Sequence, residues 1–195
     1  MKWKRTAITQ DAEFQTRAED GRRYIEGYFA KFGTRYQLWG DAYETVDPGA
    51  FHLERDLDIR ALTNHDTTLV LGRTTAGSLE LRVDDIGLWG RAEINEKDQD
   101  AVNLYERVAR RDVTQCSFGF DILDESQEYR TDIGQTVFHL RDVRLYEVSV
   151  CTFPAYEDTG VAARKAELAE ARKRKNEVWR LEQLARLKGE GNYGS

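Results

Sequence analysis

The sequence has few of the residues that mark several common classes of protein. Its 195 residues include two cysteines, Cys116 and Cys151, two prolines and three histidines. Two cysteines do not make the disulfide framework of a small secreted protein, so we expect a reducing compartment. No apolar run approaches the roughly 20 residues that a transmembrane helix needs. The opening MKWKRTAITQDAEF has no apolar segment typical of a secretory signal, so we expect neither secretion nor membrane insertion.

Charge is distributed unevenly along the chain. Residues 1–160 carry 20 Lys and Arg against 30 Asp and Glu, a net charge of −10, whereas residues 161–188 carry 9 Lys and Arg against 4 Glu, a net charge of +5. An acidic body argues against a nucleic-acid-binding face spread over the domain. The change in composition predicts a folded domain over residues 1–160 and a basic helical tail over residues 161–195.

Short alternating segments dominate the first 160 residues. Alternation of apolar and polar residues, punctuated by Gly and Asp, predicts strands at 22–33, 57–62, 69–72, 78–83, 88–94, 114–120, 137–140 and 143–151. Helical spacing of apolar residues predicts a helix over 97–111. Asp47-Pro48 is typical of a helix start and predicts a short helix to about Arg55. Residues 34–51, rich in aromatics, Gly and Asp, are expected to form a long loop packed on the body.

This pattern predicts a β-rich α+β fold. Many short strands with few helices favour a closed or nearly closed β-barrel with surrounding helices, followed by a long C-terminal helix.

The stretch TQCSFGF, residues 114–120, holds a candidate nucleophile. Alternation places Cys116 and Phe118 on a core-facing side and Ser117 and Gly119 on the other side. We therefore expect Ser117 to point outward, beside a gap at Gly119 that a substrate backbone could enter. The simpler alternative is a serine on the polar face of a strand. Cys116 is a weaker candidate nucleophile because its side chain should face the core.

Two further residues could complete a hydrolytic site. His65, between Asn64 and Asp66 at a predicted strand end, could accept a proton from a hydroxyl. Glu147 lies on the strand face opposite its apolar neighbours and could orient an imidazole, although a surface ion pair is the simpler explanation. His139, inside the apolar segment VFHL, is expected to be a packed histidine, and His52 a surface residue.

Metal and nucleotide sites are not indicated. The cysteines and histidines lack CxxC or HxxxH spacing, so no metal site is expected. No glycine-rich phosphate loop or dinucleotide fingerprint occurs, and we expect no cofactor.

Seven segments, in this order, resemble the prohead (capsid maturation) proteases of tailed phages. They are GYFAKFG from Gly27, ETVDPGAF from Glu44, LTNHD around His65, VLGRT from Val70, GSLELRVDDIGL from Gly77, CSFGF around Ser117 and YEVSVCTFPAY from Tyr146. Together they cover roughly residues 23–157. This family is similar to herpesvirus assemblin, which implies a β-barrel with surrounding helices and a serine nucleophile.

The resemblance implies a role for each candidate residue. The family's serine falls on Ser117 and its histidine on His65, and the position of assemblin's second histidine corresponds to Glu147. The implied site is a Ser-His-Glu triad, with Asp66 and Asp121 as rival third members.

The resemblance also implies a biological setting. The enzyme would act inside the phage procapsid, in the host cytoplasm, on the scaffolding segment of the major capsid protein precursor and on itself. Self-association is a further expectation, and no contact with nucleic acid or membrane is expected. The alternatives are a non-catalytic capsid-assembly or scaffold protein and a small-molecule esterase that uses the same triad.

Overall fold

The computed structural model describes the backbone of residues 5–9, all of residues 13–153, and four later positions, Ala169, Lys173, Glu177 and Arg180. Packing divides the chain into two units, Met1–Tyr156 and Glu157–Ser195, and the strands and the helix Gln99–Ala109 belong to the first. The predicted basic tail over residues 161–195, with its long helix, lies outside the described residues apart from those four positions.

Strands make up most of the described first unit. In chain order the elements are β1 (Arg5–Thr9), β2 (Gln15–Glu19), β3 (Arg22–Lys31), β4 (Tyr36–Trp39), β5 (Ala42–Val46), β6 (Arg60–Thr63), β7 (Asp66–Arg73), the 3₁₀ turn η1 (Thr74–Ala76), β8 (Leu79–Val83), β9 (Gly87–Glu93), α1 (Gln99–Ala109), β10 (Gln115–Arg130) and β11 (Gln135–Cys151).

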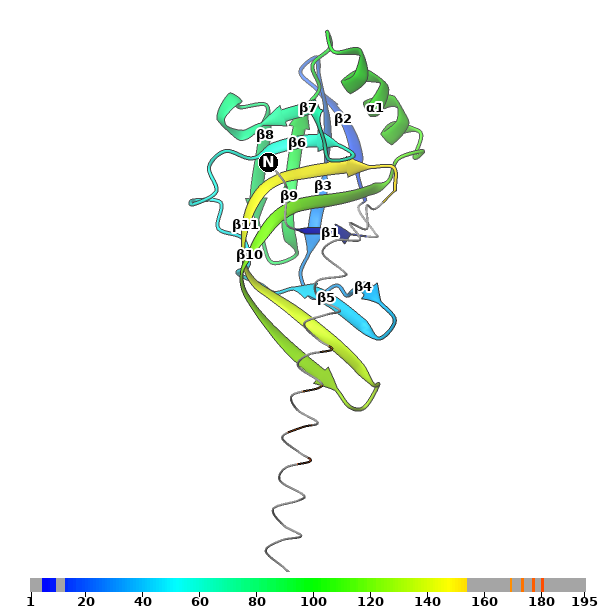
Figure 1. Ribbon diagram of the computed structural model, residues 1–195. Coiled ribbons are helices and arrows are strands. Elements are labelled where there is room, and N and C mark those ends of the chain that lie inside the picture. Colours follow the sequence, from blue (N-terminus) through cyan, green and yellow to red (C-terminus); the bar gives the residue numbers. More distant parts are fainter. Residues whose placement is uncertain are drawn as a thin grey trace, which may run out of the picture. The chain divides into compact units, whose positions relative to one another are not determined.

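The strands form two sheets. The four-stranded sheet has the order β2-β3-β9-β8, and the seven-stranded sheet follows β1-β10-β11-β5-β4, with β6 also beside β11 and β7 beside β6. The long strand β11 has two partners on one side: its first part pairs in parallel with β5, and its last part pairs in parallel with β6. The halves of β10 and β11 nearest the turn that joins them extend away from the four-stranded sheet. They lie with β4 and β5 in the lower part of the coloured ribbon in Figure 1.

The predicted barrel with surrounding helices is wrong. Neither sheet closes on itself in the described part of the chain: strands β1, β4 and β7 end the seven-stranded sheet, and β2 and β8 end the other. Among the described residues before Phe153, α1 is the one α-helix. Alternation along a strand reveals which side chains share a face but not which strands become neighbours, so closure could not be deduced from it.

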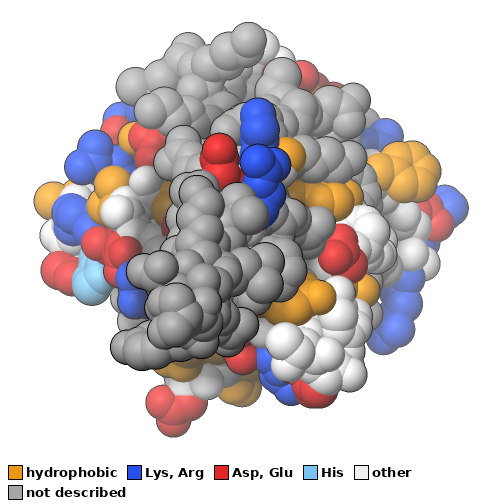
Figure 2. Space-filling model, turned by 60° about the horizontal axis from the view of Figure 1, so that its bottom comes forward, with side chains coloured by type: hydrophobic (Ala, Val, Ile, Leu, Met, Phe, Trp, Pro, Cys, Tyr) orange, Lys and Arg blue, Asp and Glu red, His pale blue; other side chains and the backbone are white. Residues whose placement is uncertain are grey.

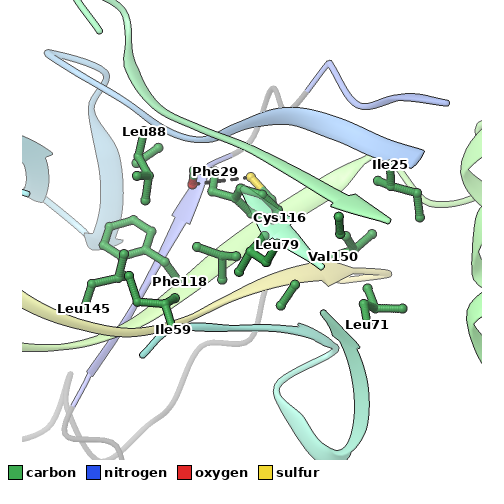
Figure 3. Close-up of a cluster of buried hydrophobic side chains, with 14 of the residues drawn as sticks. Ile25, Phe29, Ile59, Leu71, Leu79, Leu88, Cys116, Phe118, Leu145 and Val150 are labelled. Carbon is green, nitrogen blue, oxygen red and sulfur yellow. Dashed lines mark hydrogen bonds between the residues drawn. The ribbon is translucent and has the colours of Figure 1, made fainter. Parts of the chain in front are cut away.

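The core lies where the two sheets face each other. In Figure 3, Phe29 and Leu88 of the four-stranded sheet point toward Phe118 and Leu145 of the seven-stranded sheet. All four side chains are almost wholly buried. Burial of such large side chains stabilises the fold by about 1.5–3 kcal/mol each. The core face of β10 is therefore held rigidly, which also fixes the side chains on its opposite face.

The predicted helix over 97–111 is confirmed as α1. Asp98 caps its N-terminus, because the Asp98 carboxylate accepts hydrogen bonds from the backbone N–H groups of Asp100 and Ala101. Ala101, Leu104 and Val108 form its buried face.

The short helix expected after Asp47 is not present. The backbone turns at Pro48-Gly49, where Gly49 has a φ of 91° and the Ala50 N–H donates to the Asp47 carbonyl. Proline followed by a residue with positive φ is typical of a type II turn, and this turn competes with a helix start. Phe51 then forms a bridge with Val143 of β11.

Two other expectations need correction. The loop expected over 34–51 contains the hairpin of β4 and β5, and Trp39 packs near the Phe138 ring, with 6.2 Å between ring centroids. The two strands expected at 137–140 and 143–151 are the single strand β11. Arg141 and Asp142, between the two predicted strands, lie within β11 where its pairing with β10 is irregular.

Acidic and basic side chains are interspersed on the described part of the face in Figure 2, with separate hydrophobic side chains among them. Within the described residues, no helix has the length and apolarity required to cross a bilayer.

Candidate active site

The candidate site lies on the face of β10 and β11 that points away from the main core. The two strands are antiparallel, with Ser117 opposite Ser149 and Gly119 opposite Glu147. Residues directly opposite each other in an antiparallel pair project to the same side of the sheet. These four residues therefore share one face, as the alternation predicted for each strand separately.

His65 is brought to this face by a tight turn. It follows Asn64 in the two-residue connection between β6 and β7, and the φ angles of Asn64 and His65 are 52° and 60°. Positive φ at both central residues is typical of a type I′ hairpin turn, in which a histidine is uncommon. Such backbone conformations persist where surrounding contacts enforce them, and they often mark functional sites.

Several hydrogen bonds hold the turn against β11. The Asn64 N–H donates to the Val150 carbonyl at 3.0 Å, and the Asn64 side-chain oxygen accepts from the Thr152 N–H at 2.8 Å. The His65 N–H donates to the Ser149 hydroxyl at 3.1 Å. Because β6 pairs in parallel with the end of β11, these bonds fix His65 beside the strand that carries Glu147.

His65 and Glu147 are in direct contact. The distance from His65 Nδ1 to Glu147 Oε1 is 2.6 Å, and the other carboxylate oxygen, Oε2, accepts from the Ser149 hydroxyl at 2.6 Å. The Glu147 side chain is completely buried, and that of His65 is 13% exposed. A buried carboxylate is costly unless hydrogen bonds compensate for lost hydration, and both oxygens here have such bonds.

This contact determines which nitrogen of neutral His65 can act as a base. Nδ1 carries the proton and donates it to Glu147, which leaves the lone pair on Nε2. Nε2 is buried and has no hydrogen-bond partner among the described residues. An imidazole held in this tautomer is suited to remove a proton from a hydroxyl group.

Ser117 lies on the same face but not on the surface. Its exposed fraction is 0%, so the expectation of an outward-pointing hydroxyl is wrong. Both faces of β10 are covered at this point, since Cys116 and Phe118 on the other side are also fully buried. The alternation was predicted correctly, but alternation does not reveal whether the second face is covered.

Gly119 also has a different role from the one expected. A Cβ atom at this position would overlap Glu147 Oε1 and lie 3.0 Å from Glu147 Cγ. The glycine therefore makes room for the carboxylate that contacts His65, and not for a substrate backbone. The sequence does not reveal this role of Gly119, because it depends on the register that places Gly119 opposite Glu147.

We expect Gly119→Ala to displace the Glu147 carboxylate from His65. The added methyl group should cost about 1–3 kcal/mol of stability, as overpacking of buried sites does, and should lower the activity per folded molecule. Gly90→Ala is a matched control, because a Cβ there would overlap Phe29 and Leu81 in the core, away from His65. Thermal unfolding measures the loss of stability in both variants, and peptidase assays measure the activity per folded molecule. Equal activity per folded molecule in the two variants would contradict this role for Gly119.

The rival carboxylates make other contacts. Asp66 accepts from the N–H and the hydroxyl of Thr68, at 2.8 and 2.6 Å, and these bonds lower the pKa of Asp66. Asp121 accepts from the Tyr146 hydroxyl at 2.8 Å. Of the three candidate third members, Glu147 is the one in contact with His65.

The other two histidines lie apart from this network. His139 Nδ1 is 3.0 Å from Asp47, and its Nε2 is 3.5 Å from Glu128. It is therefore a half-buried histidine between two carboxylates rather than one packed in the apolar core. His52 is partly exposed and contacts Glu54 at 3.1 Å.

Both cysteines are fully buried and unlinked. The Cys116 thiol donates to the carbonyls of Tyr28 and Phe29, so it faces the core as expected. Burial, followed by the neighbouring Cys116 and Glu147, raises the pKa of Cys151 to about 12. Within the described residues, no three His, Cys, Asp or Glu side chains are grouped to hold a metal ion.

We therefore expect neither thiol to react in the native protein. A disulfide reagent at pH 8 should label native protein negligibly over minutes and should label both cysteines after denaturation, because a protonated, buried thiol is a poor nucleophile. The measurement is the absorbance of the released thiolate. Rapid stoichiometric labelling of native protein would contradict the burial of these thiols and would make Cys116 a candidate nucleophile again.

Two residues of the network were missed from the sequence. Ser149 shares the strand alternation of Glu147, and Asn64 precedes His65 in a residue pair compatible with a turn, so both signals were present. These local signals do not reveal that β6 pairs in parallel with β11, because that pairing joins segments far apart in the sequence.

Serine hydrolases combine a serine, a histidine and a carboxylate, and this face holds these three residue types. The sequence profile of the Caudovirus prohead serine protease family matches residues 10–174. The chain therefore belongs to that family.

Individual relatives were also found. The prohead protease of Enterobacteria phage HK97 is 29% identical over 152 residues, which cover 75% of this chain and 63% of that protein's own length. The chain thus spans less than two thirds of that relative. Among solved structures, the capsid assembly protease of bacteriophage T4 matches 75% of this chain and 96% of its own chain, with 14% identity and a TM-score of 0.41.

Proposed function

We propose that this chain is a serine endopeptidase of prohead maturation, with Ser117 as nucleophile, His65 as general base and Glu147 as the residue that orients His65. Membership of the prohead serine protease family supports the reaction class. The observation that carries the roles of His65 and Glu147 is the 2.6 Å contact between His65 Nδ1 and Glu147 Oε1, which leaves Nε2 free to act as a base. The role of Ser117 is supported by the CSFGF segment, which resembles the family, and by its place on the same face as Glu147.

In the proposed mechanism, His65 Nε2 accepts the Ser117 hydroxyl proton while Ser117 Oγ attacks the carbonyl carbon of the scissile peptide bond. The C–N bond breaks and His65 donates its proton to the leaving amine, which gives an acyl-enzyme. Water then attacks the ester, again with His65 as base, and releases the new carboxyl terminus and the Ser117 hydroxyl. Glu147 stabilises the imidazolium that forms in each step, and no cofactor takes part.

The proposed substrates are the scaffolding segment of the major capsid protein precursor and the enzyme itself. The proposed setting is the interior of the phage procapsid in the host cytoplasm. Support comes from the family description and from the HK97 relative, whose name is prohead protease. Self-association remains part of the proposal, since packaged enzymes would lie close together.

The basic tail is proposed to attach the enzyme to this substrate. The net charge of +5 over residues 161–188, against −10 over residues 1–160, supports an electrostatic contact with acidic scaffold segments. A chain ending at Ala163 should keep its peptidase activity but co-sediment poorly with precursor shells, and salt should weaken the attachment of the full chain. Equal co-sedimentation of both chains would exclude the attachment.

The test of the proposed function is incubation of the purified chain with a capsid protein precursor and, separately, with a small activated ester. We expect discrete cleavage of the precursor, seen by electrophoresis and mass spectrometry. Ester hydrolysis without precursor cleavage would indicate an esterase instead. Failure of both reactions would favour the non-catalytic capsid-assembly protein.

A further inference from the structure

We infer that Ser149 is a positioning residue that holds both His65 and Glu147 in their working geometry. This inference rests on the proposed function of the same site. Ser149 lies opposite Ser117, the proposed nucleophile, and its hydroxyl group orients His65 and Glu147 without touching the reacting atoms.

The Ser149 hydroxyl makes two directional hydrogen bonds. It donates to Glu147 Oε2 at 2.6 Å and accepts from the His65 backbone N–H at 3.1 Å. A hydroxyl has one proton to donate and lone pairs to accept, so both bonds form at once. Ser149 is 0% exposed, and water cannot readily replace either contact.

Each bond addresses a specific structural difficulty. The His65 backbone has a φ of 60°, which is unfavourable for a histidine, and the bond from its N–H to Ser149 helps to hold that conformation. The Glu147 carboxylate could rotate about its terminal bond, and the bond to Oε2 fixes its plane so that Oε1 faces Nδ1. One hydroxyl thus sets the position of the imidazole and the direction of its partner.

The bond to Glu147 should also influence proton binding. A donor to a carboxylate disperses its negative charge, so without this donor Glu147 should stabilise the imidazolium form of His65 more strongly, and Nε2 should take up its proton at a higher pH. His65 is in contact with this carboxylate, Arg60 is its neighbour on β6 and is bonded to Asp58, and Cys151, on which Glu147 acts, has a pKa of about 12, above the range of the assay. Loss of the hydroxyl should therefore shift the acidic limb of the activity profile to higher pH.

The first experiment compares Ser149→Thr with Ser149→Val. Threonine and valine have nearly the same shape, so the added bulk relative to serine affects both variants alike. Only threonine keeps the hydroxyl group. We expect kcat of the Val variant to be about 10- to 100-fold below that of the Thr variant, with similar KM, because a hydrogen bond to a charged group is lost. The acidic limb of kcat/KM should lie about one pH unit higher in the Val variant. Equal kcat and equal pH profiles in the two variants would overturn the inference.

Ser149→Ala provides a second test that does not depend on activity. The Nδ1 proton of His65, bonded to Glu147, should give a strongly downfield proton NMR signal that is assigned by its loss in His65→Gln. In Ser149→Ala this signal should shift or broaden, because both the alignment of Oε1 with Nδ1 and the charge on the carboxylate change. An unchanged signal would overturn the inference even if the chain cleaved no peptide, whereas absence of all hydrolysis with a changed signal would count against the proposed function alone.

Discussion

Replacement of Ser117 by alanine should abolish cleavage of the capsid precursor, with a loss of about 10⁴-fold or more in kcat/KM. Alanine has no hydroxyl group, so it cannot attack the scissile peptide bond or form an acyl-enzyme. In the proposed mechanism no other described hydroxyl on this face replaces Ser117 as nucleophile. Ser117 is fully buried between β1 and β11, so loss of its hydroxyl should lower the stability by about 1–3 kcal/mol, as removal of a buried hydrogen-bonding group does. Circular dichroism and thermal unfolding establish folding, and electrophoresis of the precursor measures activity.

Cys116→Ala is the neighbouring control for this experiment. Its thiol faces the opposite side of β10 and contacts the carbonyls of Tyr28 and Phe29. We expect some loss of stability, since a buried side chain is shortened, but activity per folded molecule should persist. Full processing by Ser117→Ala together with an inactive Cys116→Ala would transfer the role of nucleophile to the cysteine.

The second large effect is expected for Glu147→Gln. Glutamine has nearly the same size but no charge, so the imidazolium that forms during proton transfer loses its stabilising partner. We expect kcat to fall by up to about 10⁴-fold, the order seen when the carboxylate of such a triad is replaced by an amide. Steady-state kinetics on a precursor peptide provides the measurement, and KM should change little because Glu147 is buried beneath His65.

The rival carboxylates are the matched controls for this second prediction. Asp66→Asn and Asp121→Asn remove the same charge, but from groups bonded to Thr68 and Tyr146 rather than to His65. Both variants should keep activity within about tenfold of the unmodified chain. If Asp121→Asn or Asp66→Asn lost activity while Glu147→Gln kept it, the orienting role would pass to that aspartate.

Local patterns predicted local features of this molecule well. Alternation placed Ser117 and Glu147 on the correct faces of their strands, and the helical spacing of apolar residues predicted α1. These features depend on neighbours a few residues apart, which the sequence displays directly. The same local reasoning failed at Pro48, because glycine at the next position favours a type II turn.

Features set by long-range pairing could not be predicted in this way. Glu147 and His65 are 82 positions apart in the sequence, and their contact depends on the parallel pairing of β6 with β11. The role of Gly119 depends on its register with Glu147. The barrel was predicted wrongly because local alternation does not show which strands pair at the edges of each sheet, so it does not show whether a sheet closes.

Covalent trapping can show whether Ser117 is a nucleophile that His65 activates. Native protein would be treated with a fluorophosphonate, and the modified residue would be identified by mass spectrometry of its peptides. We expect one adduct per chain, on Ser117, with labelling strongly slowed in His65→Ala. An adduct on any other residue, or no adduct in a preparation that cleaves the capsid precursor, would contradict this role of Ser117.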